Sequence, residues 1–131
     1  MKRVVLFLIF IIMIGPVSAG IIVYSSLIPP AKEAIRGIRP VPDEVEYWQT
    51  PHETKVRGKG DCEDFSALIA ERYYELGISF RMVIIETRGG PHMVLQVGAV
   101  YVDPIQPKIM LVKNYKVIKT YTYKEFQKRL G

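Results

Sequence analysis

The only cysteine of this 131-residue chain lies in the stretch Gly60-Asp61-Cys62-Glu63-Asp64-Phe65-Ser66. After the cysteine, apolar residues recur at steps of three and four, at Phe65, Leu68, Ile69, Tyr73 and Leu76. This spacing predicts one apolar face of a helix that begins at Cys62. Asp61 is its expected N-cap, and Gly77 is expected to end it in a left-handed conformation.

The residues after this helix predict an antiparallel sheet. Phe80 to Glu86 is rich in β-branched and apolar residues, and a Gly-Gly-Pro turn separates it from a second strand. Strands are expected over residues 80–86, 92–97, 99–102, 109–112 and 117–121, followed by a closing helix over 123–130. A helix followed by an antiparallel sheet predicts the α+β class, with a central helix that starts at the cysteine and packs on the sheet.

The cysteine, one histidine and one aspartate suggest a nucleophilic site. A cysteine attacks as the thiolate, and the free N–H groups and dipole at a helix start favour that anion. The carboxylates of Asp61, Glu63 and Asp64 oppose it, so an imidazolium partner is needed. His92 opens the second strand, and Asp103 follows 11 residues later on the neighbouring strand, where it can accept from the other ring nitrogen.

An oxyanion site needs backbone or side-chain donors as well. The backbone N–H of Cys62 is one, and the second is either the side chain of Gln49 or the indole of Trp48. Each residue also has a purely structural interpretation. Cys62 can be a small buried residue, Asp103 a strand-ending turn residue, and Trp48 part of the core or a pocket wall. A mononuclear metal site formed by Cys62, His92 and Asp103 is a further alternative, although their spacing is not that of a structural zinc site.

Residues 1–30 form a separate unit. Residues 4–31 carry no charge, and most of them are apolar. This length is enough for an uncleaved transmembrane anchor, which we favour. The alternative is a signal peptide cleaved after Val17-Ser18-Ala19. Both place the domain outside the cytoplasm. We expect a linker with a short helix (31–38) over residues 31–46 and a domain over 47–131.

The charge of the chain argues against nucleic-acid binding. It has 18 basic and 13 acidic residues, and the positive charges are scattered along the sequence. A basic stripe on one face, which nucleic-acid binding requires, is not evident in that pattern. A single cysteine also cannot form an internal disulfide.

Four motifs together resemble the transglutaminase-like superfamily. They are the stretches Trp48–Thr54, Gly60–Ser66, Gly89–Leu95 and Tyr101–Pro104. The chain is most similar to the bacterial transglutaminase-like cysteine proteinases, over residues 47–104. The resemblance implies a papain-like fold in which Cys62 is the nucleophile, His92 the general base and acid, and Asp103 the orienting residue.

The resemblance further implies acyl transfer through a thioester to a protein or peptide substrate. Hydrolysis of a peptide or isopeptide bond is favoured, with transamidation or a silent peptide-binding module as alternatives. No cofactor is expected. Some members of the bacterial branch depend on calcium, and Asp61, Glu63 and Asp64 carry suitable oxygen ligands. We favour a capping role for these acids instead.

Overall fold

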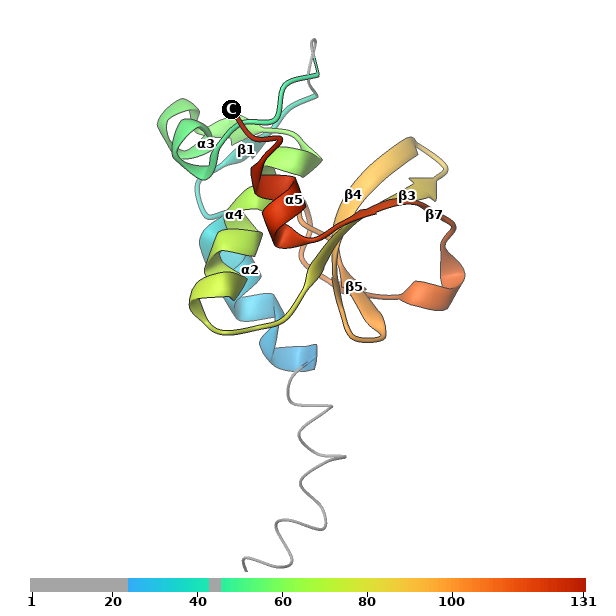
Figure 1. Cartoon of the computed structure of the whole chain (residues 1–131). Coiled ribbons are helices and arrows are strands. Elements are labelled where there is room, and N and C mark those ends of the chain that lie inside the picture. Colours follow the sequence, from blue (N-terminus) through green and yellow to red (C-terminus); the bar gives the residue numbers. More distant parts are fainter. Residues whose placement is uncertain (1–23, 43–45) are drawn as a thin grey trace, which may run out of the picture.

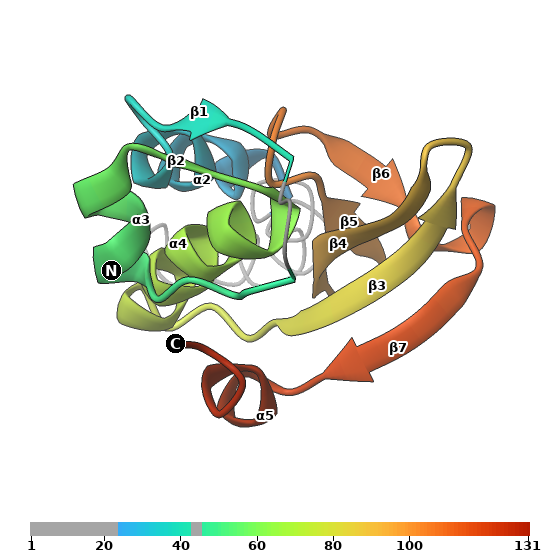
Figure 2. The same cartoon turned by 90° about the horizontal axis from the view of Figure 1, so that it is seen from above.

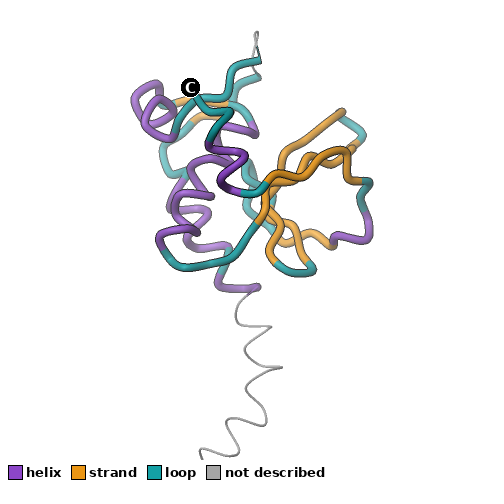
Figure 3. Tube along the Cα trace, in the orientation of Figure 1, coloured by secondary structure: helices purple, strands orange, loops and turns teal. Residues whose placement is uncertain are grey.

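A computed structural model describes residues 24–42 and 46–131 of the chain. Helices lie on one side and a five-stranded antiparallel sheet on the other (Figures 1 and 3). The sheet has the spatial order β6-β5-β4-β3-β7. Its strands are β3 (Arg81–Thr87), β4 (Gly90–Val97), β5 (Val100–Val102), β6 (Ile109–Leu111) and β7 (Val117–Tyr121). The predicted α+β class is confirmed.

The central helix is α4 (Cys62–Glu75), and it begins and ends where the sequence predicts. Asp61 is its N-cap, and Asp61 and Asp64 each accept a hydrogen bond from the other's backbone N–H. Such a reciprocal capping box satisfies two of the donors that every helix start leaves free. Gly77 follows with φ of 73°, a conformation that glycine adopts at little cost. The position of Cys62 in the first turn is therefore fixed by local sequence.

The sheet has two apolar faces. One face packs against α4 through Met82, Met93 and Leu95, which are fully buried. The opposite face carries a second cluster of Val83, Ile85, Val94 and Tyr101, against which Met110, Val112 and Tyr115 pack. The segment between β6 and β7 contains the 3-10 helix η1 (Val112–Asn114), and it closes that side of the curved sheet (Figure 2).

The remaining helices surround α4 and the sheet edge. The helix predicted over residues 31–38 occupies Ile28–Ala34 as α2, three residues earlier. The closing helix α5 spans Tyr123–Gln127, which is shorter than predicted. The sequence missed α3 (Pro51–Arg57), which Thr50 caps with Glu53 in a second capping box. His52 lies on this helix, not in a loop, although it is exposed as predicted.

Residues 57–60, predicted as a flexible loop, are ordered by pairing. Gly58 ends α3 with φ of 67°. The next two residues form β2 (Lys59–Gly60), which pairs in parallel with β1 (Arg39–Pro40). This short ladder ties the extended segment after α2 to the start of α4.

Helix α2 packs against α4 at the end remote from Cys62. Leu27 and Ala31 are fully buried in the same core as Tyr73 of α4. The Tyr73 hydroxyl donates to the backbone carbonyl of Leu27 at 2.6 Å. Residues 1–23 of the predicted anchor or signal segment (residues 1–30) lie outside the described residues, whereas its last residues belong to the folded domain through the buried Leu27 and α2. Within the described ranges, no helix combines the length and the apolar character that crossing a bilayer requires.

We predict that Tyr73→Phe destabilises the chain by about 1–3 kcal/mol, because the buried carbonyl of Leu27 loses its donor. The matched control is Tyr74→Phe, because Tyr74 is 68% exposed and its change is expected to stay within about 0.5 kcal/mol. Thermal unfolding of the full chain in mild detergent measures both. Equal effects of the two substitutions would show that the Tyr73 hydrogen bond does not hold α2.

Candidate active site

His92 and Asp103 come together on neighbouring strands. His92 lies in β4, and Asp103 directly follows β5, which pairs with β4 in antiparallel register with Leu95 opposite Val102. In that register the two residues lie diagonally on the same face. Nε2 of His92 lies 3.4 Å from Oδ2 of Asp103, and both side chains are about one-fifth exposed or less. The contact that the sequence predicts between them is present.

Asp103 is held in place from two sides. Its Oδ1 accepts hydrogen bonds from the backbone N–H groups of Ile105 at 2.9 Å and Gln106 at 3.2 Å. Burial alone would raise the pKa of this carboxyl, but the hydrogen bond from His92 and those two backbone donors lower the pKa below its ordinary value. Asp103 is therefore a carboxylate at neutral pH, with its free oxygen directed at the imidazole.

The Cys62 thiol lies beside the same strand. The backbone N–H of Met93, the residue after His92, hydrogen-bonds toward the sulfur. In this conformation the thiol itself donates to Oε2 of Glu63 at 3.5 Å. Within the described part of the chain, this bond goes to the glutamate and not to the imidazole. The helix start thus brings the sulfur to the backbone that carries His92.

The thiol is protonated in this conformation. Burial raises the pKa of Cys62 to about 12, and the charges of Glu63 and Asp61 act in the same direction, against the Met93 N–H. The sequence predicts this opposition by the neighbouring carboxylates. The finding means that the helix start alone does not produce a thiolate, so proton removal must accompany attack.

We predict that Glu63→Gln makes Cys62 more reactive, because it removes a negative charge that stabilises the neutral thiol. The rate of alkylation by iodoacetamide at pH 8 is expected to rise about 3- to 10-fold, since a lower thiol pKa gives more thiolate. Glu75→Gln, at the other end of the same helix, is the control and is expected to leave the rate unchanged. An unchanged rate in Glu63→Gln would show that burial alone controls the thiol pKa.

Asp64 anchors the segment before the site. Its carboxylate is fully buried and accepts from the backbone N–H of Gln49 at 2.8 Å, from Nε2 of Gln49 at 2.8 Å and from the backbone N–H of Asp61 at 3.0 Å. Gly60 passes so close that an added Cβ would lie 2.6 Å from the Cβ of Asp64. The glycine of the Gly-Asp-Cys motif is therefore required by this close approach.

Gln49 has its side-chain donors committed to this network. Nε2 also approaches the carbonyl of Lys59 at 3.4 Å, while Oε1 is buried and has no hydrogen-bond partner among the described residues. A carboxamide with both N–H groups directed at Asp64 and Lys59 has none left for an oxyanion. In this conformation Gln49 positions the chain beside Cys62 instead of supplying the second oxyanion donor.

The other oxyanion candidate, Trp48, lies in the core. Its ring is 7% exposed and packs against Tyr121, at a centroid separation of 5.7 Å, and Phe126, at 5.4 Å. The guanidinium of Arg129 lies over the same ring at 5.0 Å. The structural interpretation of Trp48 as a core residue is confirmed, and its role as a donor stays a prediction.

Two of the three acidic residues considered as calcium ligands have capping or anchoring roles within the protein. Asp64 has both oxygens engaged with protein donors, and Asp61 caps α4. Calcium needs six or more oxygen ligands that are free to coordinate it. Over residues 24–42 and 46–131, no group of three His, Cys, Asp or Glu side chains is arranged to hold a metal ion. The capping role predicted for Asp61 and Asp64 is confirmed.

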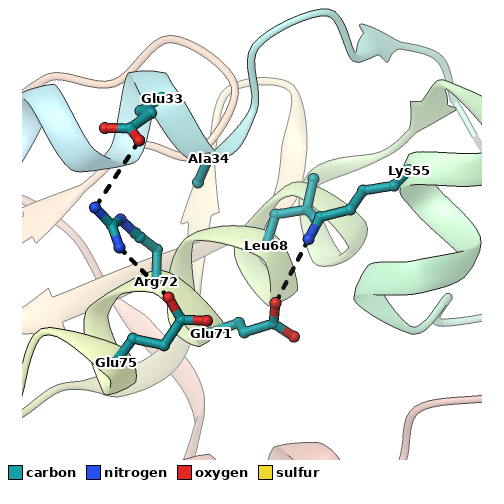
Figure 4. Close-up of a pocket in the computed structure, with 7 residues that line it drawn as sticks. All are labelled: Glu33, Ala34, Lys55, Leu68, Glu71, Arg72 and Glu75. Carbon is teal, nitrogen blue, oxygen red and sulfur yellow. Dashed lines mark hydrogen bonds and ion pairs between the residues drawn. The ribbon is translucent and has the colours of Figure 1, made fainter.

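A polar cavity of about 210 Å³ lies on another side of α4, between α2 and α3 (Figure 4). Its charged side chains pair with one another: Lys55 with Glu71 at 3.6 Å, and Arg72 with Glu75 at 3.4 Å and with Glu33 at 3.9 Å. Exposed pairs of this kind contribute little to stability. The cavity contains neither the cysteine nor the histidine, so we assign it no part in the chemistry.

The chain matches no protein-family profile and no curated protein by sequence. It does match solved structures of Legionella pneumophila LapG. The EGTA-treated form aligns with a TM-score of 0.65 at 21% identity, covering 77% of this chain and 64% of LapG. The described part of this chain therefore has a transglutaminase-like fold. The calcium-bound form gives a TM-score of 0.62 at 21% identity, covering 78% and 70% of the two chains.

A third LapG structure aligns with a TM-score of 0.64 at 20% identity, covering 79% of this chain and 69% of that one. The alignment with the EGTA-treated structure spans just under two thirds of LapG's length. The predicted core, a helix headed by a cysteine and packed on an antiparallel sheet, is therefore confirmed as a fold.

Proposed function

We propose that this protein is a thiol-dependent acyl-transfer enzyme, a cysteine peptidase whose nucleophile is Cys62. The observation that carries the proposal is that the Cys62 thiol lies at the backbone N–H of Met93, the residue after His92, while the His92 ring contacts Asp103. The transglutaminase-like fold and the motifs that resemble transglutaminase-like cysteine proteinases support the same assignment.

The geometry suggests which ring nitrogen acts on the thiol. Nε2 of His92 faces Asp103. The sulfur lies at the backbone N–H of Met93, and Nδ1 is the ring nitrogen nearer to that backbone. We therefore assign Nδ1 as the base, with Asp103 holding the Nε2–H tautomer and stabilising the imidazolium that forms.

The reaction then follows in two steps. Nδ1 takes the thiol proton as the sulfur attacks the substrate carbonyl, and the resulting imidazolium gives that proton to the leaving amine. Water, deprotonated by the same nitrogen, attacks the thioester and releases the acid and the free thiol. Because the resting thiol donates its proton to Glu63, this hydrogen bond has to be exchanged for one to His92 before attack.

Hydrolysis is the outcome that we propose, on a peptide or isopeptide bond of a protein substrate. Transamidation differs only in the second step, where a primary amine replaces water at the thioester. We also propose that residues 4–23 anchor the domain to a membrane on the outer side, since this stretch is apolar or small throughout and carries no charge.

The experiment that tests the function compares wild-type protein with Cys62→Ser on a panel of peptide and isopeptide substrates. Wild-type turnover is expected to be lost in the variant, because serine is a much weaker nucleophile beside the same base. Mass spectrometry of a stalled reaction is expected to find the acyl group on Cys62. A fluorescent amine in the same reaction separates transamidation from hydrolysis. Turnover that persists without the thiol would refute the proposal.

A further inference from the structure

An aromatic groove lies at the end of α4 that is remote from Cys62. Its volume is about 730 Å³, and its lining includes Tyr74, Ile78, Phe80, Tyr123 and Lys124. The Tyr123 ring lies 5.2 Å from both Tyr74 and Phe80, centroid to centroid. Tyr74 is 68% exposed, and its neighbour Leu76 is 47% exposed. Aromatic side chains left open to this extent are typical of a surface that meets a partner.

The described chain begins beside this surface. A second groove of about 250 Å³ shares Ser79 and Phe80 with the aromatic groove and extends to Gly98. Tyr24 lies beside Gly98, and its hydroxyl accepts from the backbone N–H of Ala99 at 3.3 Å. The first described residues and the β4–β5 turn lie at the same end of the molecule (Figure 1).

The residues directly before Tyr24 are apolar or small in sequence. Residues 4–23 precede it without a charge, and Leu27 is already fully buried against α4. A helix of that length extends about 30 Å, which matches the hydrocarbon thickness of a bilayer. A membrane anchor here would place Tyr24 and the neighbouring grooves at the level of the lipid headgroups, because Tyr24 comes less than one helical turn before the buried Leu27.

We propose that the aromatic groove rests in the headgroup region of a phospholipid bilayer, so that the membrane fixes the orientation of the domain. This inference rests on the proposed anchor and not on the catalytic assignment. Tyrosine suits that depth because its ring is apolar and its hydroxyl is polar. Arg81 and Lys124 are exposed beside the aromatic residues and extend their charges toward headgroup phosphates.

The orientation has a consequence for the substrate. Helix α4 has 14 residues, so Cys62 in its first turn lies about 20 Å from the groove at its other end. The active site then faces away from the bilayer, because the start of α4 lies toward the end of the molecule opposite the first described residues (Figure 1). The substrate is accordingly a protein segment that reaches about 20 Å beyond the membrane surface, and not a lipid or a bond within the bilayer.

Two exposed positions test the orientation in the full chain. Tyr74→Cys and Val56→Cys, each in a Cys62→Ser background, place a nitroxide label in the groove or on α3, where Val56 is 72% exposed. The protein is reconstituted in phosphatidylcholine vesicles, and the label's accessibility is measured to oxygen, which enters lipid, and to a water-soluble nickel chelate. The label at residue 74 is expected to favour oxygen at least about threefold over the label at residue 56.

Each outcome decides the proposal. Equal accessibility at the two positions, or a more lipid-exposed label at residue 56, overturns it. Failure of the protein to remain with the vesicles after a salt wash also overturns it. A second copy of the chain in the groove would shield the label at residue 74 from both reagents. It would also produce spin–spin broadening that grows with protein density. That result overturns the membrane proposal as well. Peptide hydrolysis by the wild type is measured separately in detergent, so loss of either result leaves the other intact.

Discussion

His92→Ala is expected to lower kcat on a peptide substrate by at least about 1000-fold, with a much smaller change in KM. The reason is the protonation state of Cys62. With a thiol pKa of about 12, less than about one molecule in ten thousand holds a thiolate at pH 7.5, so attack depends on a base that removes the proton. His92 is the imidazole on the strand beside the sulfur, and Asp103 holds its other nitrogen.

Three further variants test whether His92 acts together with Cys62 and Asp103. Cys62→Ala/His92→Ala is expected to be no slower than Cys62→Ala alone, since the two residues act as a unit and their effects do not add. Asp103→Asn is expected to reduce kcat by a smaller factor, because the hydrogen bonds to Ile105 and Gln106 still hold the side chain in place. The matched control is His52→Ala, on exposed α3, which is expected to retain wild-type kcat.

The pH profile gives a second readout. The lowered pKa of Asp103 keeps it ionised at and above pH 5, so a loss of kcat/KM on acidification to pH 5 is expected not to come from this carboxyl. His92→Ala is expected to leave a low rate that rises with pH as the thiol itself ionises, because the pKa of Cys62 is raised to about 12. If His92→Ala kept wild-type kcat and an unchanged profile, the imidazole would have no part in the reaction.

The central helix and the hairpin pairing of β3, β4 and β5 could be predicted because their signals are local. Apolar spacing after Cys62, a capping aspartate and a terminal glycine define α4 entirely within the stretch from Asp61 to Gly77. The Gly-Gly-Pro turn and a short β4–β5 connection bring His92 and Asp103 onto the same face. Hairpin pairing of this kind depends on turn length and alternation, both of which are visible in the sequence.

Other features depend on contacts that are distant in sequence. The start of helix α3 could have been predicted from its capping residues, Thr50-Pro51 followed by Glu53. Its seven residues, however, show no long apolar periodicity. The pairing of β1 with β2 joins Arg39 to Lys59, and no pattern predicts a two-residue parallel ladder. The hydrogen bond from the Gln49 side chain to Asp64 also joins residues 15 positions apart, so the sequence alone does not predict it.

Asp64→Ala is expected to destabilise the chain by about 3 kcal/mol or more. The substitution leaves three donors without their acceptor, namely two N–H groups of Gln49 and one of Asp61, in a place from which water is excluded. An unpaired buried donor costs about 1–3 kcal/mol, and the start of α4 also loses half of its capping box. For a domain of roughly 100 residues the melting temperature is expected to fall by about 12–20 °C.

Two further measurements separate this role from metal binding. Asp64→Asn keeps one acceptor oxygen and is expected to lose roughly half as much stability as Asp64→Ala. Gly60→Ala is expected to destabilise the chain as much as Asp64→Ala does, because the added Cβ would displace the Asp64 side chain. Unfolding is followed with calcium and with EGTA. Since both Asp64 oxygens already accept protein hydrogen bonds, the loss is expected to be the same in either condition. If the Asp64→Ala loss appeared only with calcium present, the carboxylate would be a metal ligand and the network around Gln49 would have to rearrange to release it.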